Sequence, residues 1–275
     1  MPSAMPLDGR TAIVTGASSG IGRAIAQHLG NAGAHVFLSG RTAAAMEDSK
    51  KTIEEAGGRA TVITGDVRDV AQVRSLIDSA VDATGRLDIM VNNAGLSYPA
   101  PILEGDPEEW RSMLETNILA LLVGCQAAVK AMRACEAEGQ IVNISSVAAQ
   151  RSNSGVYGST KHAVSSISSS LRDELENDTI RVTNVMPGAI ATNFARNFDR
   201  EFVETMVKMA GMDVEVKKGE RLPPEILETL ASKMKQLLGD PNDVAKAVLY
   251  AVTQPIEVNI ADIVVRPPRS MNVPH

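Results

Sequence analysis

With 275 residues, the chain is long enough to form one large α/β domain with a sizeable hydrophobic core. Its formal net charge of -6 argues against nucleic acid or an anionic membrane surface as the main partner, and its histidines and cysteines show no metal-ligand spacing. The N-terminus has no apolar signal-peptide core and the longest apolar run (residues 118–129) is too short to span a bilayer, so we expect a soluble cytoplasmic protein without a metal site.

The first elements along the chain are typical of half a dinucleotide-binding unit. Thr11–Thr15 reads as a short buried strand, and apolar residues recur at helical spacing from Gly20 to near Gly33. The turn between them has glycines at Gly-x-x-x-Gly-x-Gly, one residue longer at its first gap than the common fingerprint. Glycine permits close approach of the backbone to a pyrophosphate at a helix N-terminus. A purely structural turn is the alternative, but the context predicts phosphate binding through Gly16, Ser18, Ser19, Gly20, Ile21 and Gly22.

The next two strands carry candidate contacts for the adenosine half of such a cofactor. A buried strand at 34–39 ends in Gly40-Arg41, where an acidic residue usually binds the ribose, and arginine there favours the 2′-phosphate of NADP. A helix is expected at 43–56 and a third strand at 60–64. Asp66, followed by Val67, comes just after that strand. It either meets the adenine edge or serves as a turn or cap aspartate.

Amide side chains mark the middle of the chain. A helix at 70–84 leads to a strand at 87–91, which is followed by Asn92-Asn93-Ala94-Gly95. The next helix begins near Pro107, with Asp106 as its N-cap. That helix carries Asn117 within an otherwise apolar face. A buried amide needs hydrogen-bond partners, so Asn117 is either a satisfied core amide or a functional one.

The strand at 140–144 ends in Ser145-Ser146, and Tyr157 opens the following helix. Lys161 lies one turn further along the same face. Such a pair is common by chance, yet a nearby cation favours the phenolate and would bring the pKa of Tyr157 down from about 10. A sixth strand at 180–186 ends in Pro187-Gly188. Because open α/β sheets bind ligands at the carboxyl ends of their strands, these residues are expected to share one site.

Taken together, these motifs resemble the short-chain dehydrogenase/reductase family over residues 10–192. The resemblance implies a Rossmann-type, doubly wound α/β fold with a seven-stranded parallel sheet. It also implies a catalytic tetrad in which Tyr157 transfers the proton, Lys161 binds the nicotinamide ribose and lowers the tyrosine pKa, a serine holds the substrate oxygen and Asn117 supports a water-linked proton path. The cofactor-lining residues that it implies are Asn93, Ala94, Gly95, Pro187, Gly188, Ile190 and Thr192.

The serine position departs from the family pattern. The family usually places twelve residues between serine and tyrosine, whereas Ser146 leaves ten and Ser145 leaves eleven. Strand register is fixed by sheet hydrogen bonds, and a surface loop absorbs deletions at little cost. We therefore assign Ser146 to the substrate oxygen and place the missing residues within 149–155.

Residues 193–239 match the family's variable substrate lid within one domain spanning 1–275. A helix capped by Asp199 and another starting at Pro223-Pro224 and ending at Gly239 are expected there. Its methionines either line an apolar substrate pocket or form ordinary core. A last helix follows Asp240-Pro241, a final strand is expected at 259–265, and the proline-rich tail 266–275 is a candidate contact in a homodimer or homotetramer.

The sequence thus predicts an oxidoreductase that prefers NADP(H), with NAD(H) as a possible substitute, and interconverts a ketone or aldehyde and an alcohol. A 3-oxoacyl-thioester reductase is the alternative within enzymes. A catalytically idle dinucleotide-binding regulator is the alternative outside them. The expected partner is a small carbonyl or alcohol substrate rather than nucleic acid or a membrane.

Overall fold

A single parallel sheet forms the centre of the computed structural model, which describes residues 5–269. Seven strands lie in the order β3-β2-β1-β4-β5-β6-β7, so the order reverses between β1 and β4 as in doubly wound α/β folds. The predicted fold class is confirmed. The strands are β1 Thr11–Thr15, β2 His35–Gly40, β3 Arg59–Thr64, β4 Ile89–Asn92, β5 Gly139–Ile144, β6 Ile180–Pro187 and β7 Asp262–Val265.

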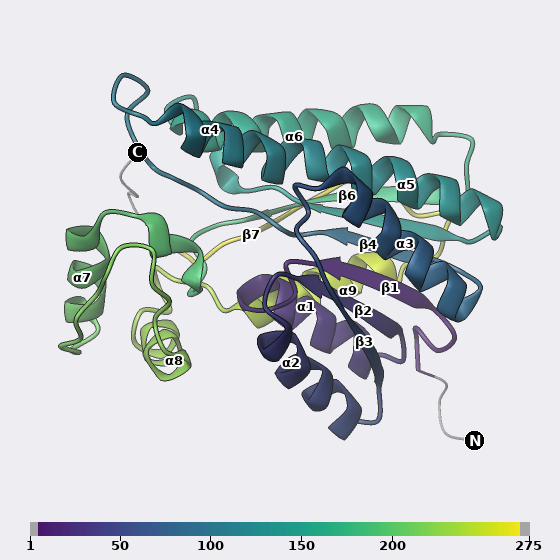
Figure 1. Ribbon diagram of the computed structural model, residues 1–275, viewed down its shortest axis with the longest axis horizontal. Coiled ribbons are helices and arrows are strands. Elements are labelled where there is room, and N and C mark those ends of the chain that lie inside the picture. Colours follow the sequence, from purple (N-terminus) through teal and green to yellow (C-terminus); the bar gives the residue numbers. More distant parts are fainter. Residues whose placement is uncertain (1–4, 270–275) are drawn as a thin grey trace.

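Helices cover both faces of this sheet (Figure 1). One face packs on α1, α2 and α9, and the other on α3, α5 and α6. A π-helical turn, η1, connects α4 to α5, and short 3-10 helices precede α6 and α7. The helices are α1 Gly20–Asn31, α2 Ala43–Glu55, α3 Val70–Thr84, α4 Pro107–Leu114, η1 Glu115–Leu119, α5 Ala120–Ala134, η2 Val147–Gln150, α6 Gly155–Glu174, η3 Asn193–Asn197, α7 Arg200–Met209, α8 Pro224–Lys233 and α9 Pro241–Val252.

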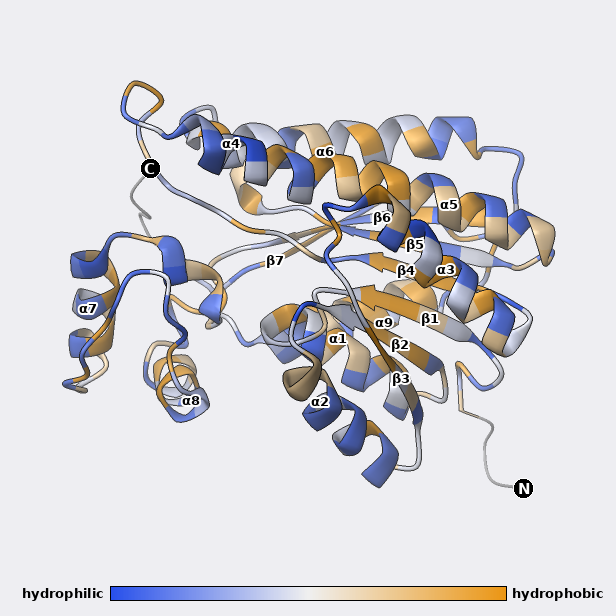
Figure 2. Cartoon of the chain, in the orientation of Figure 1, coloured by the Kyte–Doolittle hydropathy of each residue, from blue (hydrophilic) through white to orange (hydrophobic). Residues whose placement is uncertain are grey.

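The core follows from the alternation of side chains along the strands. In β1, Ala12 and Val14 join the apolar cluster under α1 and α9, while Ile13 joins the cluster under α3 and α5. Because helices bury both faces, the central strands are apolar at successive positions rather than at every second one (Figure 2). This pattern explains why short uninterrupted apolar runs in the sequence indicated the strands.

Aspartates define where several helices begin. The Asp106 carboxylate accepts a hydrogen bond of 2.9 Å from the amide of Glu108, and Pro107 occupies the first turn of α4, as predicted. Asp199 caps α7 and Asp240 caps α9 in the same way. These caps place the helix starts where the sequence indicated them.

Several element ends differ from the predicted ones; β4, for example, begins at Ile89 rather than at residue 87. The helix α6 begins at Gly155 rather than Tyr157, and Gly155 enters it with a φ of +57°. The helix α8 ends at Lys233 rather than Gly239, because Gly239 forms backbone bonds with Ala189 and Ala191 instead. The strand β7 starts at Asp262, opposite its first partner on β6.

Residues 193–239 form a separate lobe beside the sheet (Figure 1). The helices α7 and α8 enclose an apolar cluster of their own, which includes Val203, Val207 and Leu230. We call these residues the 193–239 segment. The tail predicted as a subunit contact falls largely at 270–275, outside the described residues.

One helical run, Pro107–Ala134, is long and apolar enough to cross a membrane by length and composition alone. More than half of its most apolar window is buried within the protein. Its α5 part packs against α3 and the central strands. These contacts are those of a core helix.

Candidate active site

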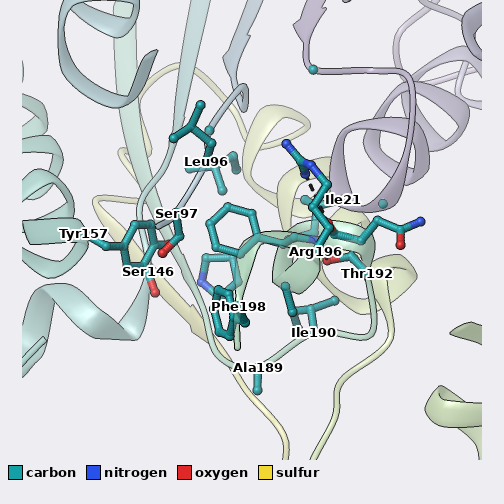
Figure 3. Close-up of a pocket in the computed structure, with 18 of the residues that line it drawn as sticks. Ile21, Leu96, Ser97, Ser146, Tyr157, Ala189, Ile190, Thr192, Arg196 and Phe198 are labelled. Atoms are coloured by element: carbon teal, nitrogen blue, oxygen red, sulfur yellow. Dashed lines mark hydrogen bonds between the residues drawn. The ribbon is translucent and has the colours of Figure 1, made fainter. Parts of the chain in front are cut away.

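A pocket of about 410 Å³ opens at the carboxyl ends of the strands, where the predicted site residues converge (Figure 3). Its volume lies in the range of small-molecule sites. All of the residues predicted to bind a cofactor line it, as do Ser146, Tyr157 and Lys161. Asn117 is buried next to the pocket and is not one of its lining residues. The convergence requires only that each motif follows a strand in one parallel sheet.

The glycine turn forms a cradle whose glycine positions have no room for a side chain. Gly16 and Gly20 have φ values of +66° and +56°, which favour glycine. A Cβ on Gly22 would lie 2.4 Å from the backbone oxygen of Gly16, and a Cβ on Gly20 would lie 3.0 Å from Thr192. Ser19 caps α1 without a side-chain hydrogen bond to its first amides. The turn thus leaves backbone donors at a helix N-terminus for an anion, which fits a dinucleotide pyrophosphate.

Hydrogen bonds connect this cradle to the end of β4. The Thr15 hydroxyl accepts bonds from the backbone amides of Asn93 and Ala94, at 3.0 and 3.1 Å. The Asn93 side chain donates to the carbonyl of Thr15 at 2.8 Å. Asn93 therefore shapes the cradle, and Gly95 passes close to both Asn117 and the ammonium of Lys161.

At the adenosine end, Arg41 is exposed and forms no ion pair among residues 5–269. Asp66 forms an ion pair with Arg68 at 2.7 Å, and the hydrogen bonds from Arg68 lower the pKa of the Asp66 carboxyl. The same carboxylate accepts the backbone amide of Arg68, as a turn aspartate does. Asp66 is thus a turn residue that also lines the pocket beside Val67.

Tyr157 and Lys161 lie one turn apart on α6, with the lysine nitrogen 5.9 Å from the centre of the tyrosine ring. Lys161 donates to the carbonyl of Ile144 at 2.8 Å, and burial lowers its pKa to about 8. Burial raises the pKa of Tyr157 to about 12, and a hydrogen bond with Ser146 acts in the opposite direction. Desolvation thus dominates the pKa of Tyr157, and the expectation that Lys161 lowers it stays a prediction.

The two serines after β5 point in opposite directions. The Ser145 hydroxyl donates to the carbonyl of Lys161 at 3.0 Å and lies 3.2 Å from the hydroxyl of Ser165. Both contacts are on α6, so Ser145 fixes the helix. Ser146 instead lines the pocket beside Tyr157, and its hydroxyl accepts the amide of Ala148 at 3.1 Å (Figure 3). The geometry therefore places Ser146, not Ser145, beside the tyrosine hydroxyl.

Asn117 is fully hydrogen-bonded within the π-helical turn η1. Its side-chain oxygen accepts the amide of Leu96 at 3.0 Å, and its nitrogen donates to the carbonyl of Leu96 at 2.9 Å and to the hydroxyl of Thr160 at 3.0 Å. The side chain thus fixes the backbone after β4 relative to α6. This arrangement matches the satisfied core amide of the two alternatives, while its position beside Gly95 keeps it adjacent to Lys161.

The residues after β6 complete the pocket. Thr192 caps η3 and packs against Gly20, so the glycine turn and the start of the 193–239 segment meet. Ile190 pairs with Gly239 in an isolated bridge, which closes the base of the segment. Pro187 is the last residue of β6, and the amide of Gly188 donates to the carbonyl of Val265 on β7 at 2.8 Å.

Sequence reasoning missed the aromatic lining of the pocket. Three of the four phenylalanines in the chain, Phe194, Phe198 and Phe202, line it. The Phe194 ring lies 5.5 Å from the ring of Tyr157, centre to centre. Their spacing of four residues was a usable signal. Of the methionines considered, Met206 lines the pocket.

The other methionines do not line it. Met212 and Met234 pack within the 193–239 segment, where Met234 is buried. Met209 is exposed. Met212 and Met234 are therefore core residues, as one interpretation predicted, and Met206 is a pocket residue, as the other predicted.

Comparisons with known proteins agree with this geometry. A profile described as short chain dehydrogenase matches residues 10–202. An uncharacterized oxidoreductase of Staphylococcus saprophyticus is 34% identical over 265 residues, covering 95% of this chain and 98% of that protein.

Two solved structures share the fold at 28% identity. A metagenomic short-chain oxidoreductase in complex with NADP has a TM-score of 0.74, covering 95% of this chain and 98% of that one. A variant of the actinorhodin polyketide ketoreductase with NADPH has a TM-score of 0.76, covering 94% of this chain and 95% of that one.

Proposed function

Because the chain belongs to the short-chain dehydrogenase family of oxidoreductases, we propose that it uses NADP(H) to interconvert a ketone or aldehyde and the corresponding alcohol. The observation that carries this proposal is the pair of hydroxyls of Ser146 and Tyr157, which lie beside each other in the same pocket as the glycine cradle (Figure 3). A phenol that can exchange a proton, with a second hydroxyl beside it and a dinucleotide site in the same pocket, is what proton transfer coupled to hydride transfer requires.

The side chains divide the proton chemistry between them. The bound nicotinamide would supply or accept the hydride. Ser146 and Tyr157 present two hydroxyl donors to one substrate oxygen, which stabilises negative charge that develops on it. Since burial raises the pKa of Tyr157 to about 12, its phenol is protonated at neutral pH and is the proton donor in the reductive direction. In oxidation, the phenolate accepts the proton of the alcohol.

NADP(H) is favoured over NAD(H) by the residues at the end of β2. Arg41 lies at the pocket edge without a carboxylate partner in the described part of the chain, so its guanidinium is available to a 2′-phosphate. Two relatives of known structure were solved with NADP or NADPH. These observations support a preference for NADP(H), with NAD(H) as a weaker substitute.

The pocket lining favours a bulky apolar substrate. The ring of Phe194 lies beside that of Tyr157. The ring centres of Phe198 and Phe202 are 6.1 Å apart, and both residues line the pocket. Met206 adds an adaptable apolar surface. A ketone with an aromatic or long aliphatic group would bury more apolar area here than a short one. The solved polyketide ketoreductase keeps a 3-oxoacyl thioester as the second candidate substrate.

A substrate panel tests the proposal. Purified protein would be assayed for NADPH oxidation with short aliphatic ketones, aryl ketones, aldehydes and a 3-oxoacyl thioester, with Tyr157→Phe as the matched control. We expect the highest kcat/KM among bulky apolar carbonyl compounds and little turnover in the variant. Tight NADPH binding without turnover of any compound would contradict the proposal and favour a dinucleotide-binding regulator.

We also propose that the protein is a cytoplasmic homodimer or homotetramer. Leu114, Leu119 and Leu122 are between 42% and 48% exposed on the α4–η1–α5 run. An exposed apolar row on a long helix favours self-association. Light scattering after size-exclusion chromatography measures the oligomer mass, and a monomer at micromolar concentration would contradict this proposal.

A further inference from the structure

The pocket carries an excess of positive charge that the protein as a whole does not share. Eight arginine or lysine side chains line it but only one acidic side chain, Asp66, which is already paired with Arg68. The formal net charge of the chain is -6. Positive charge is therefore concentrated where an anionic ligand would bind. Arg41 and Lys161 account for part of this charge through the proposed cofactor contacts.

Arg196 is a member of this group for which the sequence predicted no role. It belongs to η3, the short helix that Thr192 caps. Among the described residues, its guanidinium donates to the carbonyl of Asn193, at 3.1 Å. The residue is partly buried, and no carboxylate in residues 5–269 forms an ion pair with it. Burial lowers the pKa of Arg196, and the charges of Arg221 and Arg41 lower it further. The guanidinium of Arg196 thus lies within reach of the charges of both Arg221 and Arg41.

Hydrogen bonds hold the chain beside Arg221 against η3. The Asn193 side chain accepts the amide of Leu222 at 2.7 Å and donates to its carbonyl at 3.1 Å. The amide of Gly219 donates to the carbonyl of Arg196 at 2.6 Å. The two arginines are therefore positioned together by the 193–239 segment, and both line the pocket with Arg41.

The position of Arg196 indicates which ligand it meets. In Figure 3 it lies beside Thr192 and Ile21, whereas Tyr157 and Ser146 lie at the other end of the view. Thr192 packs on Gly20 of the glycine cradle. Arg196 is thus at the phosphate-binding end of the pocket rather than at the apolar end, where the substrate is expected.

We propose that Arg196, supported by Arg221, contacts the phosphate groups of the bound dinucleotide, so that the 193–239 segment closes on the cofactor as well as on the substrate. The inference rests on the proposed function. An anion between Arg41 and the two segment arginines would remove the repulsion among them and supply Arg196 with the partner that the described residues lack. The pyrophosphate and the 2′-phosphate are the two groups within the ligand that have this chemistry.

Binding measurements with paired variants test the proposal. Isothermal titration would give dissociation constants for NADPH and NADH with wild-type protein, Arg196→Gln, Arg196→Lys and Arg221→Gln. Arg200→Gln is the matched control, because Arg200 is on α7 of the same segment but pairs with Glu204 outside the pocket. We expect Arg196→Gln to weaken NADPH binding by about 10- to 100-fold, the range for a bidentate arginine–phosphate contact, and Arg200→Gln to leave it unchanged.

The two cofactors distinguish the two phosphates. An equal loss of affinity for NADPH and NADH would place Arg196 on the pyrophosphate. A loss of affinity for NADPH alone would place it on the 2′-phosphate. A second readout is chymotrypsin cleavage within the segment, which bound NADPH should slow in wild-type protein and slow less in Arg196→Gln. If the glutamine variant does not fold, Arg196→Lys is expected to show a smaller loss, because lysine cannot form two parallel bonds to a phosphate.

Wild-type affinity for both cofactors in Arg196→Gln, or in Arg196→Lys if only that variant folds, would overturn the inference. Failure of the wild-type protein to bind either dinucleotide would instead overturn the proposed function. The two failures are therefore distinguishable.

Discussion

Replacing the two serines after β5 one at a time is the sharpest test of the site geometry. Ser146→Ala removes a hydroxyl that lies beside Tyr157 and lines the pocket (Figure 3). Ser145→Ala removes a buried hydroxyl whose partners, Lys161 and Ser165, both belong to α6. The two substitutions are chemically identical and one residue apart, so each is the control for the other.

Their expected effects differ in kind. Loss of one donor to a developing oxyanion lowers kcat by about 10- to 10³-fold, and we expect this for Ser146→Ala with little change in the melting temperature. Ser145→Ala loses roughly one net hydrogen bond, about 1 kcal/mol. Its partner Ser165 keeps a bond from Asn184, so no new buried group is left unpaired. For a chain of this size, 1 kcal/mol corresponds to a lowering of the melting temperature by about 2 °C.

Steady-state kinetics on one carbonyl substrate, combined with thermal unfolding of both variants, measures the two effects. The reasoning predicts a kinetic defect in Ser146→Ala and a stability defect in Ser145→Ala. If Ser145→Ala lost turnover while Ser146→Ala retained it, the register of β5 would be shifted by one residue. If both variants retained turnover, neither hydroxyl would be needed at the substrate oxygen.

The remaining predictions concern the cofactor and the proton. Tyr157→Phe should bind NADPH almost normally but turn over at least ~10²-fold more slowly, whereas Lys161→Ala should impair both; titration and kinetics measure these, and substantial reductase activity in Tyr157→Phe would exclude the mechanism. Arg41→Gln should weaken NADPH binding by about 10- to 100-fold without affecting NADH, and equal wild-type affinities for the two cofactors would contradict this. Since the pKa of Tyr157 is raised to about 12, its phenol loses its proton only at alkaline pH. Alcohol oxidation, which needs the phenolate, should therefore rise with pH above neutrality and ketone reduction should decline; a pH profile of kcat/KM with the opposite sign would refute this assignment.

Most of the fold could be predicted because its signals are local. Each strand is an apolar run delimited by glycine or polar residues, and aspartates such as Asp106 and Asp199 mark helix starts. The errors lie where backbone contacts between distant residues set the boundary. Gly239 leaves helical structure because it pairs with Ile190, and no nearby residue signals that pairing.

That the candidate residues would converge on one pocket was predictable for the same reason. Residues at the carboxyl ends of parallel strands must meet, so the pocket followed once the strands were assigned. Pocket electrostatics could not be predicted, because the pKa values of Tyr157 and Lys161 depend on how much water the fold removes from them. The lining from Phe194 and Arg196 also depends on how the 193–239 segment folds back over the sheet.

The short connection between Ser146 and Tyr157 is tolerated because hydrogen bonds to the strands position α6. Asn92, Asn143 and Asn184 are in register across β4, β5 and β6. Their side chains form a buried polar row that faces α6, in which the first donates to the second and the other two donate to hydroxyls on the helix.

The contacts with α6 lie along the helix after Tyr157. Asn143 donates to Ser168 at 3.0 Å, Asn184 donates to Ser165 at 3.2 Å, and Ser145 bonds the carbonyl of Lys161. These bonds fix the position of α6 relative to the sheet, and the loop at 151–154 adds a contact between the carbonyl of Arg151 and the ring of His162. A deletion in that loop therefore changes its path over the surface but leaves the tyrosine opposite Ser146, because loop length carries little free-energy cost compared with the loss of buried hydrogen bonds.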